Sequence, residues 1–115
     1  MRPHRRLDVW KKAIDFVTKI YKVTERFPET EKFGLVAQMR RAAISIPSNI
    51  AEGAARKSAK EFQQFLSIPQ GSASGLETQL MISGKLGFLG KEETGLLEEL
   101  EEVSRMLVGL SRSLE

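Results

Sequence analysis

The sequence predicts an all-α protein, an up-down-up-down antiparallel four-helix bundle. Four segments repeat apolar residues at steps of three and four, the spacing that places them on one face of a helix. No segment shows the alternation of apolar and polar residues that marks a half-buried strand. The segments are joined by roughly three to five residues, and such short connections join antiparallel neighbours. A chain of 115 residues has the size of one domain, so residues 1–115 should form a single bundle.

The first expected helix runs from about Leu7 to Phe27, and Pro28 ends it because proline cannot continue a helix. Its apolar stripe consists of Leu7, Trp10, Ile14, Val17, Ile20, Tyr21 and Phe27. Trp10 and Tyr21 fall on this stripe. We therefore expect both rings in the core rather than on the surface as platforms for stacked bases.

The second expected helix runs from about Glu31 to Ala54. Glu29 and Glu31 lie near its N-terminus, where the helix dipole favours negative charge. Pro47 lies inside the apolar pattern of this segment. Proline lacks the amide donor and clashes with the preceding turn, so we expect a kink at Pro47.

The third expected helix begins at Ser58, which forms a capping box with Glu61. Its buried side should consist of Phe62, Phe65, Leu66, Pro69, Ala73, Leu76 and Leu80. Residues 71–75 are all small, and they are compatible either with a kinked continuous helix or with a local break after Pro69. We favour the kinked helix. Gly87 and Gly90 indicate its end and a turn.

The fourth expected helix has the most regular pattern. Glu92 and Glu93 favour its N-terminus and Arg112 its C-terminus. Its seam alternates steps of four and three, as in an antiparallel bundle or a coiled coil. The residues of this seam are Leu96, Leu100, Val103, Leu107, Leu110 and Leu114.

A stripe of polar side chains accompanies the apolar face of the second helix. At 100° per residue it consists of Gln38, Arg41, Ser45, Asn49, Glu52 and Arg56. Two interpretations are open. The side chains bind a ligand or take part in catalysis, or they bond to one another, to the kink at Pro47 or to a facing helix. Because neighbours in the stripe are three or four residues apart and within reach of each other, we favour the structural or interface role.

The sequence argues against an enzyme. It has no cysteine, and its only histidine, His4, lies near the N-terminus, so common zinc sites are excluded within one chain. It has no glycine-rich phosphate-binding loop. The paired glutamates of the last helix are adjacent in sequence, and adjacent helical residues point about 100° apart. We expect no cofactor and no metal. Since no apolar run has the length of a signal peptide or a membrane span, a cytoplasmic protein is expected.

Positive charge is concentrated in the first half of the chain. Residues 1–60 hold 14 Lys and Arg against 6 Asp and Glu, a net charge of +8, and residues 61–115 have a net charge of −5. Such a surface suits the phosphates of RNA or DNA, although two oppositely charged, solvated halves would give the same counts. The candidate nucleic-acid-binding residues are Arg2, Arg5, Arg6, Lys11, Lys12, Lys19, Lys22 and Arg26.

Three segments carry a resemblance to a known family. FGLVAQMRRAAISIPSNIAEG, residues 33–53, resembles the signature of the bacterial four-helix bundle family of 23S rRNA intervening sequence proteins. Residues 7–28 and 65–80 resemble two further blocks of that family, so the likeness covers nearly the whole chain. The string Ser-Ile-Pro-x-Asn-Ile-Ala-Glu-Gly is its specific part. Pro69 and Gly75 depart from the pattern, which usually has a helix-compatible and an acidic residue there.

The resemblance implies an oligomer and offers no catalytic residue. The family is similar to the accessory proteins of diversity-generating retroelements, which form pentameric barrels and bind nucleic acid and a reverse transcriptase. It therefore implies a homo-oligomer, a ring of five bundles. The opposite charges of the two halves would suit head-to-tail contacts, which close into rings when the rotation permits.

The sequence thus favours a non-enzymatic, oligomeric protein that binds RNA or DNA through a basic surface with low sequence specificity. A rival hypothesis is a structural or adaptor protein that scaffolds a protein partner such as a reverse transcriptase. In that case the polar stripe and the small residues 71–75 would form the contacts. A third hypothesis, a nuclease, needs a carboxylate cluster that only folding could assemble.

Overall fold

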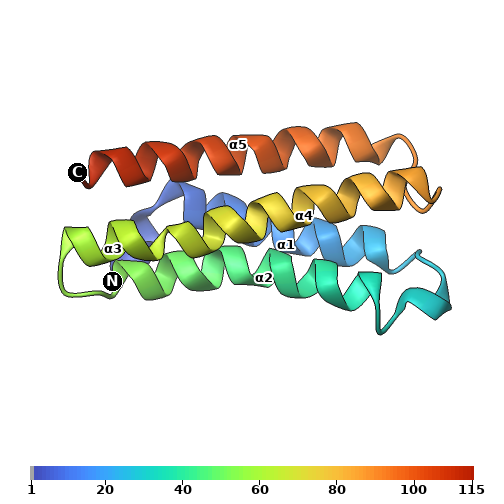
Figure 1. Cartoon of the computed structure of the whole chain (residues 1–115), viewed down its shortest axis with the longest axis horizontal. Helices are drawn as coiled ribbons and strands as arrows, with labels where there is room; N and C mark the ends of the chain where they lie inside the picture. The colour runs from blue at the N-terminus through green and yellow to red at the C-terminus, as the bar shows by residue number, and fades with distance from the viewer. Residues whose placement is uncertain (1) are drawn as a thin grey trace.

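The computed structural model describes residues 2–115, and their regular structure is entirely helical (Figure 1). Five α-helices and two short 3₁₀ helices follow one another along the chain. They are η1 (Pro3–Arg6), α1 (Asp8–Thr24), η2 (Glu29–Glu31), α2 (Leu35–Ala54), α3 (Ala59–Phe65), α4 (Ser67–Lys85) and α5 (Glu92–Ser113).

The long helices form the expected four-helix bundle. α1 packs on α2, α2 on α4, α4 on α5, and α5 returns to α1, which closes a bundle of 44 × 23 × 21 Å. Consecutive long helices run in opposite directions (Figure 1). The N-terminus, the α2–α3 connection and the C-terminus therefore all lie at one end, at the left of Figure 1. No helix of residues 2–115 combines the length and the apolar character needed to cross a membrane.

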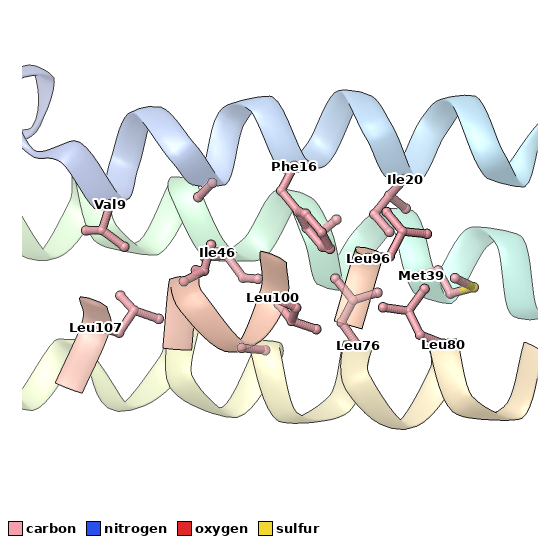
Figure 2. Packing of buried hydrophobic residues seen from close by; sticks show 14 of the residues in the cluster. Val9, Phe16, Ile20, Met39, Ile46, Leu76, Leu80, Leu96, Leu100 and Leu107 are labelled. Atoms are coloured by element: carbon pink, nitrogen blue, oxygen red, sulfur yellow. The ribbon is translucent and has the colours of Figure 1, made fainter. Parts of the chain in front are cut away.

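The core runs along the axis of the bundle and receives side chains from all four long helices (Figure 2). Phe16 and Ile20 come from α1, Met39 and Ile46 from α2. The buried side of α4 is the predicted one from Leu66 to Leu80, although Phe62 and Phe65 in α3 are only half-buried. The α5 seam is likewise confirmed: its first four members are buried, and Leu110 and Leu114 pack against the core from its edge.

The buried face of α1 is rotated from the predicted one. Val9, Ala13 and Phe16 lead it, whereas Ile14 and Tyr21 are 37% and 38% exposed. The apolar residues of α1 cover a wide arc, and the helix turns the middle of that arc to the core. Its edges stay at the surface. The expectation that Tyr21 lies in the core was therefore wrong, whereas Trp10 is half-buried and packs against the core.

The second helix starts four residues later than predicted. Glu29 and Glu31 belong to η2, and Gly34 precedes the first residue of α2 with an irregular backbone (φ −106°, ψ −107°). Pro47 lies within α2, which continues through it to Ala54. The kink expected at Pro47 stays a prediction.

The predicted third helix is two helices, α3 and α4, interrupted at Leu66. A proline ring clashes with the carbonyl four residues earlier, which for Pro69 is that of Phe65, the last residue of α3. The break therefore precedes Pro69 rather than following it, and both helices run on in the same direction (Figure 1). The Ser58 cap is confirmed, because its hydroxyl oxygen accepts from the Glu61 amide at 3.1 Å.

Two glycines fix the turns at opposite ends of the bundle. Gly87 ends α4 with φ +81°, and the amide of Phe88 donates to the Ser83 carbonyl at 2.9 Å, as in a Schellman motif. Gly53 lets α3 approach the end of α2. A Cβ atom there would lie 3.0 Å from Phe62 Cδ1 and 3.2 Å from Phe65 Cβ.

Candidate nucleic-acid interface

Three of the predicted basic residues pair with α5. Lys12 Nζ lies 3.2 Å from Glu102 Oε2, Lys19 pairs with Glu99, and Arg26 Nη2 lies 3.2 Å from Glu92 Oε1. The three cations are seven residues apart, so they line one edge of α1 along the antiparallel α5. We call these three pairs the α1–α5 ladder. Much of the charge difference between the two halves of the sequence is thus compensated within one bundle.

The ladder also affects the titration of Glu92 at the start of α5. The pKa of Glu92 is lowered from its ordinary value of 4.5, first by hydrogen bonds to the backbone at Glu92 and at Gly90. The positive charge of Arg26 lowers this pKa further. A carboxylate at a helix N-terminus is stabilised in this way by the amides exposed there.

Three other predicted cations lie at one end of the bundle, together with three cations of the α2–α3 region. Arg5 and Arg6 lie in or beside η1, which packs on α2, and the α2–α3 connection lies at the same end (Figure 1). His4 anchors η1, because its ring contacts that of Trp10 edge-on at 4.8 Å. We call this group the basic end; it consists of Arg2, Arg5, Arg6, Arg56, Lys57 and Lys60.

All six residues of the basic end are exposed, and none forms an ion pair with any of residues 2–115. Lys11 and Lys22 on α1 are also exposed and share this property. The predicted surface is thus divided in two. One set of cations is compensated by α5, and the other set is available to an anionic ligand.

The structure separates the polar stripe of α2 into two groups. The Ser45 and Ser72 hydroxyls lie 2.8 Å apart and bond α2 to α4, and Asn49 Nδ2 donates to Ser45 O and Ser45 Oγ at 2.8 and 2.9 Å. Ser45 therefore joins α2 to α4, and Asn49 bonds to Ser45 within α2. Gln38, Arg41 and Glu52 are exposed and form none of the side-chain hydrogen bonds among residues 2–115.

Sequence reasoning missed a groove between α1 and α2. Tyr21 lines it from α1; Lys32, Phe33, Arg40, Arg41 and Ile44 line it from the start of α2 and the turn before it. We call it the α1–α2 groove; its volume is about 440 Å³. Phe33 is 90% exposed. A signal was present in the sequence, because Phe33 precedes the helix-starting Gly34 and belongs to none of the predicted stripes.

The outer sides of α2 and α4 carry little charge. Glu77 and Lys85 are the only charged residues of α4. Ile68 and Ile82 on α4 are exposed, and Gly75 lies midway between them in the sequence with open space around it. We call this surface the α2–α4 face.

Residues 2–115 contain no cluster of three or more acidic or histidine side chains that would hold a metal ion. The acidic residues of α5 that face α1 are paired with cations instead. Besides the α1–α2 groove, an open groove lies between α1 and α5 and is lined by Lys19, Lys22 and Glu99 among others.

The chain matches the model of a known protein family. The family model described as 23S rRNA-intervening sequence protein matches residues 5–109. The match includes the whole of α1 to α4 and most of α5. No curated protein matches the chain.

Proposed function

The chain belongs to the 23S rRNA-intervening sequence protein family, and we propose that this member is a non-enzymatic, oligomeric protein that binds RNA or DNA. Binding is to the phosphate backbone, with low sequence specificity. The proposal includes a cytoplasmic location. The observation that carries it is the basic end, where six exposed Lys and Arg residues lie together without ion-pair partners among residues 2–115.

Unpaired cations suit phosphates better than paired ones. A cation releases counterions from nucleic acid only as far as it neutralises a phosphate. Lys12, Lys19 and Arg26 must first give up a glutamate of α5. Arg5, Lys57 and Lys60 are free to bind at once. Lys11 and Lys22 extend the surface from the basic end along α1.

The test is fluorescence anisotropy with a labelled RNA hairpin and a DNA duplex at several salt concentrations. Replacing Arg5, Lys57 and Lys60 together by glutamine removes charge from both segments of the basic end. If all three contact phosphates of duplex DNA, the slope of log affinity against log salt should fall by roughly 2.7. The matched control replaces Lys12, Lys19 and Arg26 by glutamine, and its slope should change less.

Two results would contradict this assignment. The absence of binding to either probe at low salt would overturn nucleic-acid binding altogether. A basic-end variant that binds like the parent protein would show that the phosphates lie elsewhere, and a larger loss in the control would point to the ladder side of α1.

A second function, the scaffolding of a protein partner, is favoured by the α2–α4 face. Exposed Ile68 and Ile82 on a surface with few charges fit an interface with protein. The same face would serve the ring of five bundles that the family resemblance implies. Light scattering should give five times the mass of one chain. Gly75→Gln should reduce this mass and Gly109→Gln, in open space on α5, should not; a monomeric parent protein would refute the ring.

A further inference from the structure

We infer that the α1–α2 groove binds a base of single-stranded nucleic acid, with Phe33 as the surface on which the base stacks. The inference rests on the proposed function and names its ligand class. One of the rings of the groove, Tyr21, was expected in the core from the sequence. In the structure, Phe33 and Tyr21 lie beside Lys32, Arg40 and Arg41.

Phe33 is the most exposed large apolar side chain of residues 2–115. It lies in the short connection between η2 and α2, where Lys32 Nζ is 5.6 Å from the centre of its ring. The ring has no place in the core, so the fold does not account for it. An exposed aromatic ring with a cation beside it is the usual platform on which proteins stack unpaired bases.

Arg40 provides a fixed cation at the same place. Its guanidinium lies over the Tyr21 ring at 4.4 Å, its Nε donates to Thr24 Oγ1 at 2.9 Å, and its Nη2 donates to the Tyr21 carbonyl at 3.2 Å. These bonds use two of the five donor hydrogens of the guanidinium, so three remain for a ligand. The side chain is oriented before the ligand arrives, which lowers the entropy cost of binding.

The charge of the groove selects an anionic ligand. Its lining contains Lys32, Arg40 and Arg41 and no carboxylate. Lys32 is paired with the exposed Glu29 at 3.9 Å, outside the lining, so Arg40 and Arg41 are the cations of the groove without an ion-pair partner among residues 2–115. The volume of about 440 Å³ lies within the range of sites for small organic groups. A nucleotide has both parts that this lining fits, a flat base for Phe33 and a phosphate for the cations. A base within a duplex cannot stack on a protein ring, so the ligand must be single-stranded.

One strand can reach both the groove and the basic end. α1 runs from the basic end to the groove, and Lys11 and Lys22 are exposed along it. They are eleven residues apart, which is roughly 16 Å along a helix. We therefore expect the backbone of the strand to follow α1 while one base enters the groove.

The first experiment compares anisotropy of a labelled oligo-uridine strand of roughly 15 nucleotides, the upper end of known site sizes, with a duplex of equal length. Phe33→Ala should weaken binding of the strand by roughly 5-fold to 100-fold and leave duplex binding unchanged. Phe33→Leu keeps an apolar side chain without a ring and should lose nearly as much. The control is Leu86→Ala, which removes another exposed apolar side chain, 57% exposed, outside the groove.

The second experiment uses Phe33→Trp as a reporter of stacking. The natural sequence has one tryptophan, Trp10, which is half-buried beside His4. Addition of the oligo-uridine strand should quench the fluorescence of the variant and barely affect that of the parent protein. An equal response in both proteins would contradict a base at position 33.

The outcomes separate this inference from the function on which it rests. If neither strand nor duplex binds the parent protein, both fail. If both bind and Phe33→Ala changes neither, nucleic-acid binding stands and the groove assignment is overturned. If Phe33→Ala instead lowers the mass measured by light scattering, and Phe33→Leu restores it, the groove holds a second copy of the chain and the inference is also overturned.

Discussion

The two sides of this bundle are built from the same length of helix and differ sharply in charge. α1 and α5 together carry 14 charged residues in 39 positions, whereas α2 and α4 carry five in the same number. Exposed ion pairs join α1 to α5. α2 and α4 are joined by small side chains and by the half-buried hydrogen bond between Ser45 and Ser72. The comparison teaches that one core can support two kinds of helix contact at its surface, one joined by opposite charges and one joined with little charge at all.

The largest expected effect lies on the low-charge side, at the close approach of α3 to α2. Gly53→Ala places a Cβ atom 3.0 Å from Phe62 and 3.2 Å from Phe65, so these side chains of α3 must give by a few tenths of an ångström. We expect a loss of about 1–3 kcal/mol in the free energy of unfolding, the usual cost of overpacking. The measurement is urea unfolding followed by circular dichroism.

The matched control for this variant is Gly109→Ala in α5, where nothing lies within 4 Å of the new methyl group. There alanine should stabilise the protein by roughly 0.5–1 kcal/mol, because it is the better helix former. Stabilisation by Gly53→Ala as well would show that the contact between α2 and α3 is not tight.

The next effect concerns the hydrogen bonds between α2 and α4. Ser45→Ala removes the partner of both Ser72 and Asn49. Because these groups are only partly buried, water replaces some of what is lost, and we expect a cost of about 1 kcal/mol. The control is Ser48→Ala: Ser48 is exposed on the same helix, so this variant measures the gain in helix propensity alone. Equal unfolding midpoints for the two variants would leave the Ser45 bonds without a role in stability.

A smaller effect is expected on the charged side. Replacing Lys12 and Lys19 by glutamine breaks two exposed pairs of the ladder, and each pair contributes at most about 1 kcal/mol. The loss should shrink as salt is added, because exposed charges are screened within about 10 Å at 0.1 M salt. A loss of stability that is independent of salt would mean that packing of the lysine stems, not charge, joins α1 to α5.

The smallest effect is the pH dependence of Glu92. Its folded-state pKa is lowered, so its contribution to stability is present above pH 4.5 and is lost as pH falls through the folded value. The difference in unfolding free energy between the parent protein and Glu92→Gln should therefore be constant near neutral pH and narrow below about pH 4.5. A difference that widens on acidification would reverse the sign assigned to this carboxylate.

The sequence predicted the bundle and the α5 seam because both depend on the spacing of strong apolar residues. The prediction of the buried face was wrong in α1, where the apolar residues cover a wider arc than the face that is buried. In α1 nothing in the spacing tells whether Phe16 or Tyr21 turns inward, since that depends on where α2 and α5 lie. The start of α2 was misplaced because the irregular backbone at Gly34 overrides the acidic residues before it.

The candidate site was predicted in part for the same reason. The cations of α1 were found from composition, yet their division into paired and unpaired sets depends on α5, eighty residues away. Lys12, Lys19 and Arg26 are seven residues apart, as are Glu92 and Glu99, and this shared spacing was a usable signal. The α1–α2 groove forms only when both helices are in place. Its one trace in the sequence is Phe33, an aromatic residue that belongs to none of the predicted stripes.

Arg40 has a consequence for the helical hairpin that α1 and α2 form. Its Nη2 donates to the Tyr21 carbonyl, which lies in the last turn of α1, so a side chain of α2 places positive charge at the negative end of the α1 dipole. The register of the two helices is thus held by a clamp between their facing surfaces. The connection from Glu25 to Gly34 does not have to set that register, and its length can change without shifting one helix along the other.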